Sequence, residues 1–261
     1  MRKPRLYDLA VYATQGLFVL VLIGVWQYLY SAEVVSHSLL PSPWQVVRNL
    51  PDLVSRGTTW SAVRITGQEI VIAYLVCVVV GLLVGFIAGR QETIRRVADP
   101  LLVWAQVVPI VILYPACILI WGLGSTSKIV FAAAYGVLPI AYGTMRALAH
   151  VDVRLLNAAR SLGASRLDLV FKVALPSARP LVLASLRLGA ALVIIGVFAG
   201  EILGSLGGVG YQITATSQRY QSADSYGFIL IALAMMAVLQ YLLSRLMPGG
   251  DSIDGAAGAR R

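Results

Sequence analysis

The chain has 261 residues, of which 58% are hydrophobic and only 13% charged, about half the charged share of an average soluble domain. Its mean hydropathy is +0.79. These values exclude a disordered chain, a disulfide-stapled secreted scaffold and most soluble enzymes, because none of these carries so much apolar surface. They indicate an all-α integral membrane protein with a single domain.

Six apolar runs follow one another along the chain, and each is close to the roughly 20 residues that a helix needs to cross the hydrocarbon core. The first run is too long for the apolar segment of a signal peptide, so we expect an uncleaved span. Pro109 and Pro115 interrupt the third run, and Arg187 and Glu201 lie within the fifth. The predicted transmembrane domain covers residues 9–246, with spans at 9–30, 60–89, 101–121, 129–148, 181–203 and 226–246.

The basic residues predict the orientation of these spans. Of the 21 lysines and arginines, 15 fall in segments that lie inside if the N-terminus is cytoplasmic, and four fall outside. This asymmetry follows the positive-inside rule. We therefore expect both termini in the cytoplasm, with a short N-terminal segment at residues 1–8 and a disordered Gly/Ala/Asp-rich tail at 247–261. The same asymmetry explains the net charge of +9 without nucleic acid.

The long outside segment between the first two spans contains a predicted helix. Pro43 suits a first helical turn, and Trp44, Val47 and Leu50 recur at a spacing that places them on one face. Trp44 and Trp60 are typical of the interfacial aromatic belt. We expect a short helix lying on the outer surface.

The sequence carries no cluster that predicts a metal or catalytic site. Cys77 and Cys117 lie in apolar runs and are expected to be small buried side chains, and His37 and His150 are far apart. The chain also lacks a G-x-x-x-x-G-K-[ST] phosphate loop, paired carboxylates and a nucleophile elbow. We therefore expect neither enzymatic activity nor a directly bound cofactor.

The longest inside segment, residues 150–176, has the pattern of two short helices rather than of a linker. The first carries an apolar stripe of Val151, Leu155, Ala158 and Leu162. Gly163 follows at a position typical of a helix C-terminus. The second, which we expect to end at Leu175–Pro176, carries a stripe of Leu167, Val170, Phe171 and Ala174. Periodicity alone leaves an amphipathic connector lying on the membrane surface as the alternative.

Within this segment the chain reads Asn157-Ala158-Ala159-Arg160, then Gly163-Ala164, and later Leu175-Pro176. The series resembles the EAA loop of ABC importer permeases, whose pattern is E-A-A-x-x-x-G followed by I and then L-P. The chain departs from that pattern at Asn157, where the family has Glu, and at Val173, where it has Ile. The resemblance implies that the loop couples the permease to an ATPase through Asn157, Ala158, Ala159, Arg160, Gly163, Ala164, Leu175 and Pro176.

Other series lie in the regions of the third and fifth spans. They are Val107-Val108-Pro109, Tyr114-Pro115, Trp121-Gly122-Leu123-Gly124, Ser127-Lys128-Ile129, Gly200-Glu201-Ile202-Leu203 and Gly207-Gly208-Val209-Gly210-Tyr211. Together they resemble the nitrate/sulfonate/taurine-type permeases. The resemblance extends over most of the chain.

The resemblance implies a type I ABC importer fold and a transporter whose functions are divided among several subunits. This chain would be the transmembrane permease subunit in the bacterial inner membrane, paired with a second copy or a paralogue. Two separate ATPase subunits would bind ATP and magnesium, and an extracytoplasmic binding protein would deliver the substrate. Because one chain carries one permease-like half, we expect a homodimer.

Charged side chains within spans are costly in lipid and are therefore candidates for the translocation path or gate. Glu201 either anchors the turn at residues 207–211 or takes part in a gate. Arg187, for which the sequence offers no partner, either snorkels to the cytoplasmic surface or attracts an anion on the inner half of the pathway. Arg64 and Glu69 are not spaced as an ideal helical pair, and we expect them at the outer interface.

Glycines spaced four apart predict close helix packing, within or between subunits. They form two stripes, Gly81, Gly85 and Gly89 in the second span and Gly196, Gly200 and Gly204 in the fifth.

The resemblance favours a small anion of the nitrate/sulfonate/taurine type as the substrate. The same machinery importing a heterocyclic or aromatic nutrient is the alternative. A secondary transporter is less favoured, because no inverted repeat relates the two halves of the chain.

Overall fold

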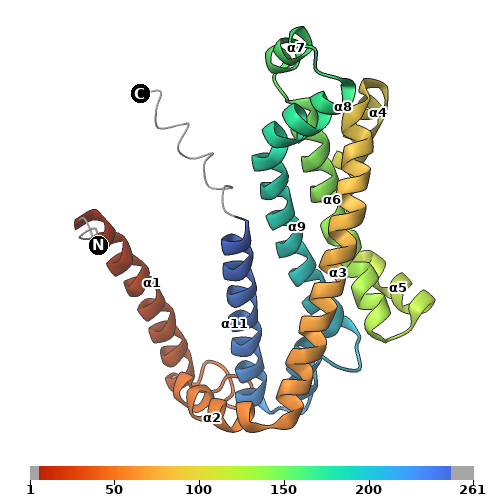
Figure 1. Cartoon of the computed structure of the whole chain (residues 1–261). Helices are drawn as coiled ribbons and strands as arrows, with labels where there is room; N and C mark the ends of the chain where they lie inside the picture. The colour runs from red at the N-terminus through yellow and green to blue at the C-terminus, as the bar shows by residue number, and fades with distance from the viewer. Residues whose placement is uncertain (1–5, 248–261) are drawn as a thin grey trace.

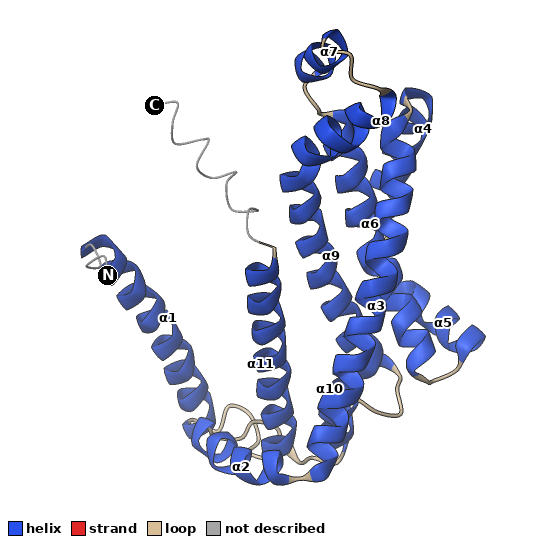
Figure 2. Cartoon of the chain, viewed as in Figure 1, coloured by secondary structure: helices blue, strands red, loops and turns tan. Residues whose placement is uncertain are grey.

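The computed structural model of the chain describes residues 6–247, and all regular structure in that range is helical (Figure 2). The predicted all-α fold is confirmed. The predicted tail from residue 248 on, and residues 1–5, lie outside the described range. In chain order the elements are α1 (Leu6–Ser31), α2 (Pro43–Ser55), α3 (Gly57–Arg90), α4 (Glu92–Val107), the 3-10 turn η1 (Ile110–Leu113), α5 (Tyr114–Trp121), α6 (Ser125–Ala149), α7 (Val153–Ser161), α8 (Arg166–Asp168), the π turn η2 (Leu169–Ala174), α9 (Leu175–Leu203), α10 (Val209–Gln218) and α11 (Ser222–Leu246).

Three long helices, α3, α6 and α9, pack together and form the core of the chain (Figure 1). Cys77, Ile140 and Val193, one from each helix, are fully buried. The predicted burial is therefore confirmed for Cys77, whereas Cys117 on α5 is only half-buried. Apolar side chains of this kind hold the three helices as one unit, and the other elements attach to its ends and sides.

The glycine stripes bring these three helices close together within one chain. A Cβ at Gly81 would lie 2.7 Å from Ile140 Cγ2, and one at Gly85 would lie 2.6 Å from the Ala141 carbonyl oxygen. On α9, a Cβ at Gly196 would lie 2.9 Å from Ala132 Cα. Residues without a side chain are needed where backbones approach this closely. The stripes predicted from the sequence therefore pack α3 and α9 against α6.

Helices α1 and α11 stand apart from this core along most of their length (Figure 1). In α1, none of the side chains described from Ala13 to Ser31 is buried. Near its end, Trp26 Nε1 donates to the Pro41 carbonyl oxygen at 3.0 Å and the Trp26 ring lies 5.4 Å from that of Tyr226. In α11, the buried residues, Ser225, Gly227, Phe228 and Ala232, all lie in its first half. Much apolar helix surface is thus left for lipid or another chain.

The third predicted span is broken rather than continuous. Helix α4 and the segment of η1 and α5 are bent by 81° relative to each other. Pro109 lies at the break, because proline cannot donate the helical hydrogen bond and clashes with the preceding turn. Pro115, by contrast, lies in the first turn of α5, where proline is tolerated. Residues 6–247 contain five helices long and apolar enough to cross a membrane, or six if this bent pair counts as one span.

Helix α2 begins at the predicted position. Ser42 and Gln45 form a capping box, in which the Gln45 N–H donates to Ser42 Oγ at 3.1 Å and the Ser42 N–H donates to Gln45 Oε1 at 2.9 Å. The helix packs onto the chain through Val46 and Leu53. Of the predicted apolar face, Trp44 and Val47 are exposed and Leu50 is half-buried.

The fifth span is longer than predicted, and the expected helix end at Leu175–Pro176 is wrong. The chain stays helical from Arg166 to Leu203, with a π turn in residues 169–174. In that turn the Leu175 N–H donates to the Val170 carbonyl. Pro176 follows in the first turn of α9. A widened turn before a proline accommodates the missing donor without breaking the helix.

Candidate functional site

Two regions at opposite ends of the core carry the residues singled out from the sequence. We call the end with α2 and α10 the outer end, following the orientation that the basic residues predict, and the end with α7 the inner end. The inner loop is residues 150–165, and the outer turn is residues 203–210. In Figure 1, α7 stands beyond the ends of α3, α6 and α9, on the side to which the start of α1 and the end of α11 also point.

The inner loop is shaped by two helix caps. Asp152 is the N-cap of α7 and accepts a hydrogen bond from the Arg154 N–H at 2.8 Å. At the other end Gly163 has a φ of +83°. The Gly163 N–H donates to the Arg160 carbonyl at 3.0 Å, and the Ala164 N–H donates to the Ala159 carbonyl at 3.1 Å. These two bonds define a Schellman motif, so the predicted role of Gly163 in ending the helix is confirmed.

The face of α7 that the sequence predicts as apolar is turned to the surroundings. Leu155 and Ala158 are exposed, and Leu162 is 88% exposed. Val151, the first residue of the predicted stripe, lies before α7 and is buried. Exposed apolar side chains on a short helix beyond the core are typical of a surface that a partner covers.

The other residues of the EAA-like series fall into two groups. Asn157 and Arg160 are exposed on α7, where Arg160 Nη1 donates to Asn157 Oδ1 at 3.3 Å. Ala159 and Ala164 are half-buried at the end of the same helix. Leu175 and Pro176 instead lie in the first turn of α9. The structure therefore places the two halves of the series on separate elements.

A short polar motif starts the helix after the inner loop. Asp168 Oδ2 accepts hydrogen bonds from the hydroxyl and the N–H of Ser165, at 2.6 and 3.2 Å. Lys172 Nζ lies 2.6 Å from Asp168 Oδ1. The hydrogen bond from Lys172, together with those from Ser165, lowers the pKa of Asp168 to about 2. Asp168 is therefore ionised throughout the physiological pH range.

At the outer end, Glu201 fastens the outer turn to α3. Glu201 Oε2 accepts from the Gly210 N–H at 2.7 Å, and Oε1 accepts from the Thr66 hydroxyl at 2.6 Å. Thr66 Oγ1 in turn accepts from the Val209 N–H at 2.9 Å. The Glu201 side chain is 1% exposed, so all these bonds form away from water, where leaving any partner unpaired is costly.

A buried ion pair lies beside it. Lys128 Nζ is 2.6 Å from Glu69 Oε1, and each side chain is 2% exposed. Lys128 Nζ also donates to Ser205 Oγ at 2.8 Å and to the Gly207 carbonyl at 3.2 Å. Glu69, which the sequence places at the outer interface, is thus buried within the chain and paired with Lys128 from the start of α6. The pairing was missed because Glu69 was considered only with Arg64, its neighbour in sequence.

Residues from several of the subfamily-like series meet around the outer turn. The Tyr114 hydroxyl donates to the Gly204 carbonyl at 2.7 Å. Gly208 has a φ of +106°, and a Cβ there would lie 1.9 Å from Glu201 Oε1. The series that contain Tyr114, Lys128, Glu201 and Gly208 thus meet in one cluster. Their shared resemblance to one subfamily is the sequence signal that could have revealed this cluster.

Arg187 has a partner that the sequence did not reveal. Its guanidinium donates to the Met247 carbonyl oxygen at the end of α11, where a cation is favoured by the helix dipole. The side chain is half-buried. Arg187 therefore links α9 to the inner end of α11, and it is not brought near Glu201, which lies towards the other end of α9.

A bundle of long apolar helices with a polar cluster at one end and an exposed helical loop at the other is typical of a multi-pass membrane protein. Comparison with known proteins narrows the class. A model of the family described as "Binding-protein-dependent transport system inner membrane component" matches residues 78–248. The chain belongs to this family of ABC importer permeases, which confirms the resemblance found in the sequence.

Relatives with assigned names support the same family. The chain is 30% identical over 211 residues to the putative aliphatic sulfonates transport permease protein SsuC of Bacillus subtilis (strain 168), covering 81% of this chain and 76% of the relative. It is 28% identical over 228 residues to the taurine transport system permease protein TauC of Escherichia coli (strain K12), covering 85% and 82%.

Solved structures confirm the type I permease fold. The chain matches a structure of the MetNI methionine ABC transporter in an inward facing conformation with a TM-score of 0.57 and 20% identity, covering 79% of this chain and 96% of that one. A structure of an amino acid ABC transporter with histidines matches with a TM-score of 0.57 and 18% identity, covering 78% and 94%.

Membership of this family fixes the coarse function. The chain is a multi-pass inner-membrane permease of an ABC importer, and it is not an enzyme, because ATP hydrolysis belongs to a separate subunit of such transporters. An ATPase and a substrate-binding protein are the partners that the family implies.

Proposed function

We propose that this permease imports a small organic or inorganic anion and is driven through its inner loop by two ATPase subunits that bind ATP and magnesium. The exposed apolar face of α7, ended by the Schellman motif at Gly163, is the observation that carries the proposal. In this proposal Asn157, Ala158, Ala159, Arg160, Gly163 and Ala164 form the docking surface. Leu175 and Pro176 connect that surface to α9.

The central experiment changes Gly163. The φ of +83° strains any side chain there, whereas among residues 6–247, apart from its two chain neighbours, a Cβ would meet no atom within 4 Å. Gly163→Ala therefore tests backbone strain alone, and Gly163→Asp adds bulk and charge at the proposed interface. We expect Gly163→Asp to reach the membrane but to lose uptake in proteoliposomes and its coupling to ATP turnover, with Gly163→Ala affected less. Normal transport by Gly163→Asp with its ATPase still bound would contradict the proposed coupling role.

The substrate class rests on the relatives. They include the sulfonate and taurine permeases named above and the nitrate import permease protein NrtB of Synechococcus elongatus (strain ATCC 33912 / PCC 7942 / FACHB-805), which is 27% identical over 203 residues. The formylaminopyrimidine transport permease protein ThiX of Halalkalibacterium halodurans, 28% identical over 226 residues, favours a heterocyclic nutrient as the second candidate. Competition of labelled taurine uptake by nitrate, sulfonates and a pyrimidine separates the two.

The proposed assembly contains two copies of this chain, two ATPase subunits and an extracytoplasmic binding protein. The open surfaces of α1 and α11 support contact with a second copy. Mass measurement of the detergent-solubilised complex tests this, because a single copy without a paralogue would rule it out.

Arg187 and Glu201 keep distinct proposed roles. Glu201 anchors the outer turn, and we propose that this anchor shapes the outer mouth of the pathway. For Arg187, the bond to Met247 supports a link between α9 and α11. Arg187→Gln leaves uptake unchanged if this link is structural only, and raises the KM for an anionic substrate if the guanidinium also faces the pathway.

A further inference from the structure

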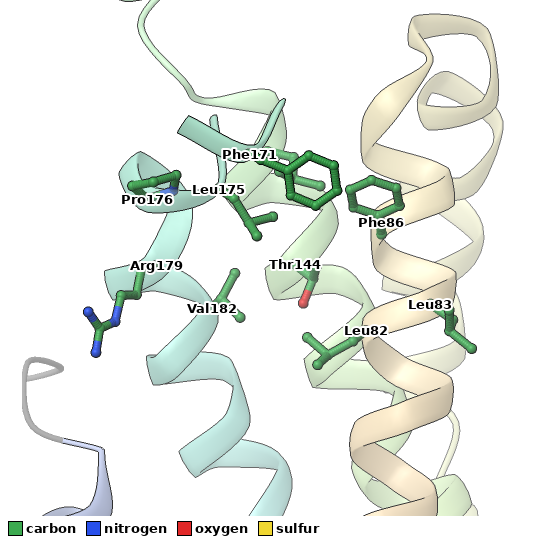
Figure 3. Close-up of a pocket in the computed structure, with 10 residues that line it drawn as sticks. Leu82, Leu83, Phe86, Thr144, Phe171, Leu175, Pro176, Arg179 and Val182 are labelled. Carbon is green, nitrogen blue, oxygen red and sulfur yellow. The ribbon is translucent and has the colours of Figure 1, made fainter. Parts of the chain in front are cut away.

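Cavities at the two ends of the core differ in character. The cavity between the inner ends of α3, α6 and α9 has a volume of about 610 Å³ and mainly apolar walls (Figure 3), which offer little that selects a charged solute. A cavity of about 350 Å³ lies at the outer end, between α10 and the starts of α3 and α11, and we call it the outer cavity. Most of the residues that line it are polar, and its volume falls within the roughly 300–1,000 Å³ of small-molecule sites in proteins.

Five side chains that line the outer cavity carry hydrogen-bond donors and make no hydrogen bond or ion pair with any residue between 6 and 247. They are Thr58, Tyr211, Gln212, Arg219 and Gln221. These residues come from three segments of the chain, namely α3, α10 and the turn after α10. A cavity where donors from separate segments converge suits a ligand that is rich in acceptor atoms.

The charges in the wall favour a ligand of one sign. Two arginines and one aspartate line the outer cavity, so its wall has one positive charge in excess. The Asp224 carboxylate is already engaged, because it accepts from Asn49 Nδ2 at 2.5 Å and from Arg56 Nη1 at 2.6 Å. Arg219 is thus left as a cation without a counter-ion in the described part of the chain. An anion is the ligand that such a wall attracts.

The turn after α10 holds Arg219 in place. The Tyr220 N–H donates to the Ser217 carbonyl at 3.0 Å, and the Gln221 N–H donates to the Thr216 carbonyl at 2.9 Å. These two bonds define a Schellman motif. Tyr220 has a φ of +57°, in the left-handed region that bulky side chains rarely adopt. Strained backbone of this kind is concentrated at functional sites.

A second polar cavity, of about 310 Å³, shares Tyr211 and Arg219 with the outer cavity and extends to the outer turn. Glu201 also lines it, but both of its carboxylate oxygens are engaged by Thr66 and Gly210. Arg219 therefore belongs to both cavities, and an anion held there lies next to the turn that Glu201 anchors.

We propose that the outer cavity binds the oxyanion group of the imported substrate, a sulfonate, nitrate or carboxylate, before the substrate enters the pathway. This proposal rests on the proposed import of a small anion. The Arg219 guanidinium donates to two oxygens of the oxyanion, and the Gln212 and Gln221 amides donate to the oxygens that remain. The hydrocarbon part of an organic anion contacts Ala215 and Phe228, the apolar residues of the wall.

The experiment uses a cysteine in the cavity wall and the purified complex of permease and ATPase, without ATP or binding protein. Thr58→Cys is treated with an anionic reagent, sulfonatoethyl methanethiosulfonate, and with a cationic one, trimethylammonioethyl methanethiosulfonate. Each rate is divided by the rate at Ser38→Cys, because Ser38 is exposed and lies outside the cavity wall. The unaltered chain, which contains Cys77 and Cys117, gives the background rate. The normalised rate should be at least about 5-fold higher for the anionic reagent, as a nearby unpaired charge predicts.

Two arginine variants test the source of this preference. Arg219→Gln should abolish it, whereas Arg48→Gln should leave it unchanged, because Arg48 is exposed on α2 outside the cavity wall. Methanesulfonate should also slow the reaction of Thr58→Cys with the neutral reagent methyl methanethiosulfonate, and uncharged dimethyl sulfone should not. Equal normalised rates, a preference that survives in Arg219→Gln or is lost equally in Arg48→Gln, or equal protection by the two solutes would overturn the proposal.

These measurements involve neither transport nor the inner loop, so their failure would overturn the site alone. Failure of the proposed function would appear instead in the uptake competition and in Gly163→Asp, neither of which changes the reaction rates at Thr58→Cys.

Discussion

The outer turn and the inner loop are both glycine-containing turns that join helices, but they are held in opposite ways. The outer turn is fastened by buried side chains from α3, α5 and α6, including an ion pair at 2.6 Å. The inner loop is held by its own caps and leaves Leu155 and Leu162 exposed. The difference is that the outer end of the permease is completed within the chain, whereas the inner end leaves apolar side chains exposed, as the proposed docking surface requires.

The largest effect is expected from breaking the buried ion pair. Lys128→Met leaves the Glu69 carboxyl buried without its ion-pair partner, which costs about 3–5 kcal/mol in comparable cases. We expect a large fall in the thermal unfolding temperature in detergent. In the double variant Glu69→Leu/Lys128→Met no charge is left unpaired, so most of the loss should be recovered. If the double variant is as unstable as Lys128→Met, the loss of stability comes from the missing hydrogen bonds between Lys128 and the outer turn, and not from the unpaired Glu69.

Gly163 and Gly208, two glycines with positive φ, give a matched comparison of the two regions. Gly208→Ala forces a Cβ to 1.9 Å from Glu201 Oε1, so it should disrupt the outer turn and lower the amount of folded protein. Gly163→Ala meets open space and should cost only the backbone strain of about 1–2 kcal/mol. Thermal unfolding of both variants checks this order. Equal losses of thermal stability would mean that the outer turn is not more tightly packed around its glycine than the inner loop.

A smaller effect is expected at Thr66. Thr66→Val keeps the side-chain shape but leaves the Val209 N–H and a Glu201 oxygen without this partner, at a cost of about 1–3 kcal/mol. Hydrogen exchange at the start of α10 should rise as the turn loosens. Thr214→Val is the control, because Thr214 makes only long hydrogen bonds, of 3.3 and 3.4 Å, to carbonyl groups. Similar exchange rates at the start of α10 in both variants would contradict the role of Thr66 in holding the outer turn.

The smallest effect concerns Asp168. Its folded-state pKa of about 2 lies below the ordinary value of 3.8, so its stabilising contribution is present above pH 3.8 and is lost as the pH falls towards 2. Hydrogen exchange around Ser165, corrected for the intrinsic rate, should therefore show no change in local stability between pH 8 and 5. Asp168→Asn should loosen this turn slightly at every pH in that range. A transition near pH 6 would contradict the assignment.

Local patterns predicted much of the fold, because the length of an apolar run and the residues that cap a helix can be recognised from residues adjacent in the sequence. The long spans, the start of α2 at Pro43 and the turn at Gly163 are examples. Contacts between distant segments could not be predicted in this way. Glu69 and Lys128 lie on different helices, and only the packing of α3 on α6 brings them together. The π turn before Pro176 was missed because the proline was expected to end the helix, whereas a widened turn accommodates its missing donor and the helix continues.

Helix α3 connects the two regions as a single rod. Its 34 residues contain no proline, and at 1.5 Å per residue they span about 51 Å. Thr66 and Glu69, near one end, hold the outer turn, while Phe86, near the other, lines a cavity between the inner ends of α3, α6 and α9. A tilt of about 10° around the middle of such a rod displaces each end by about 4 Å in opposite directions. Helix α3 therefore acts as a lever. A tilt that moves its outer end away from the neighbouring helices moves its inner end towards them.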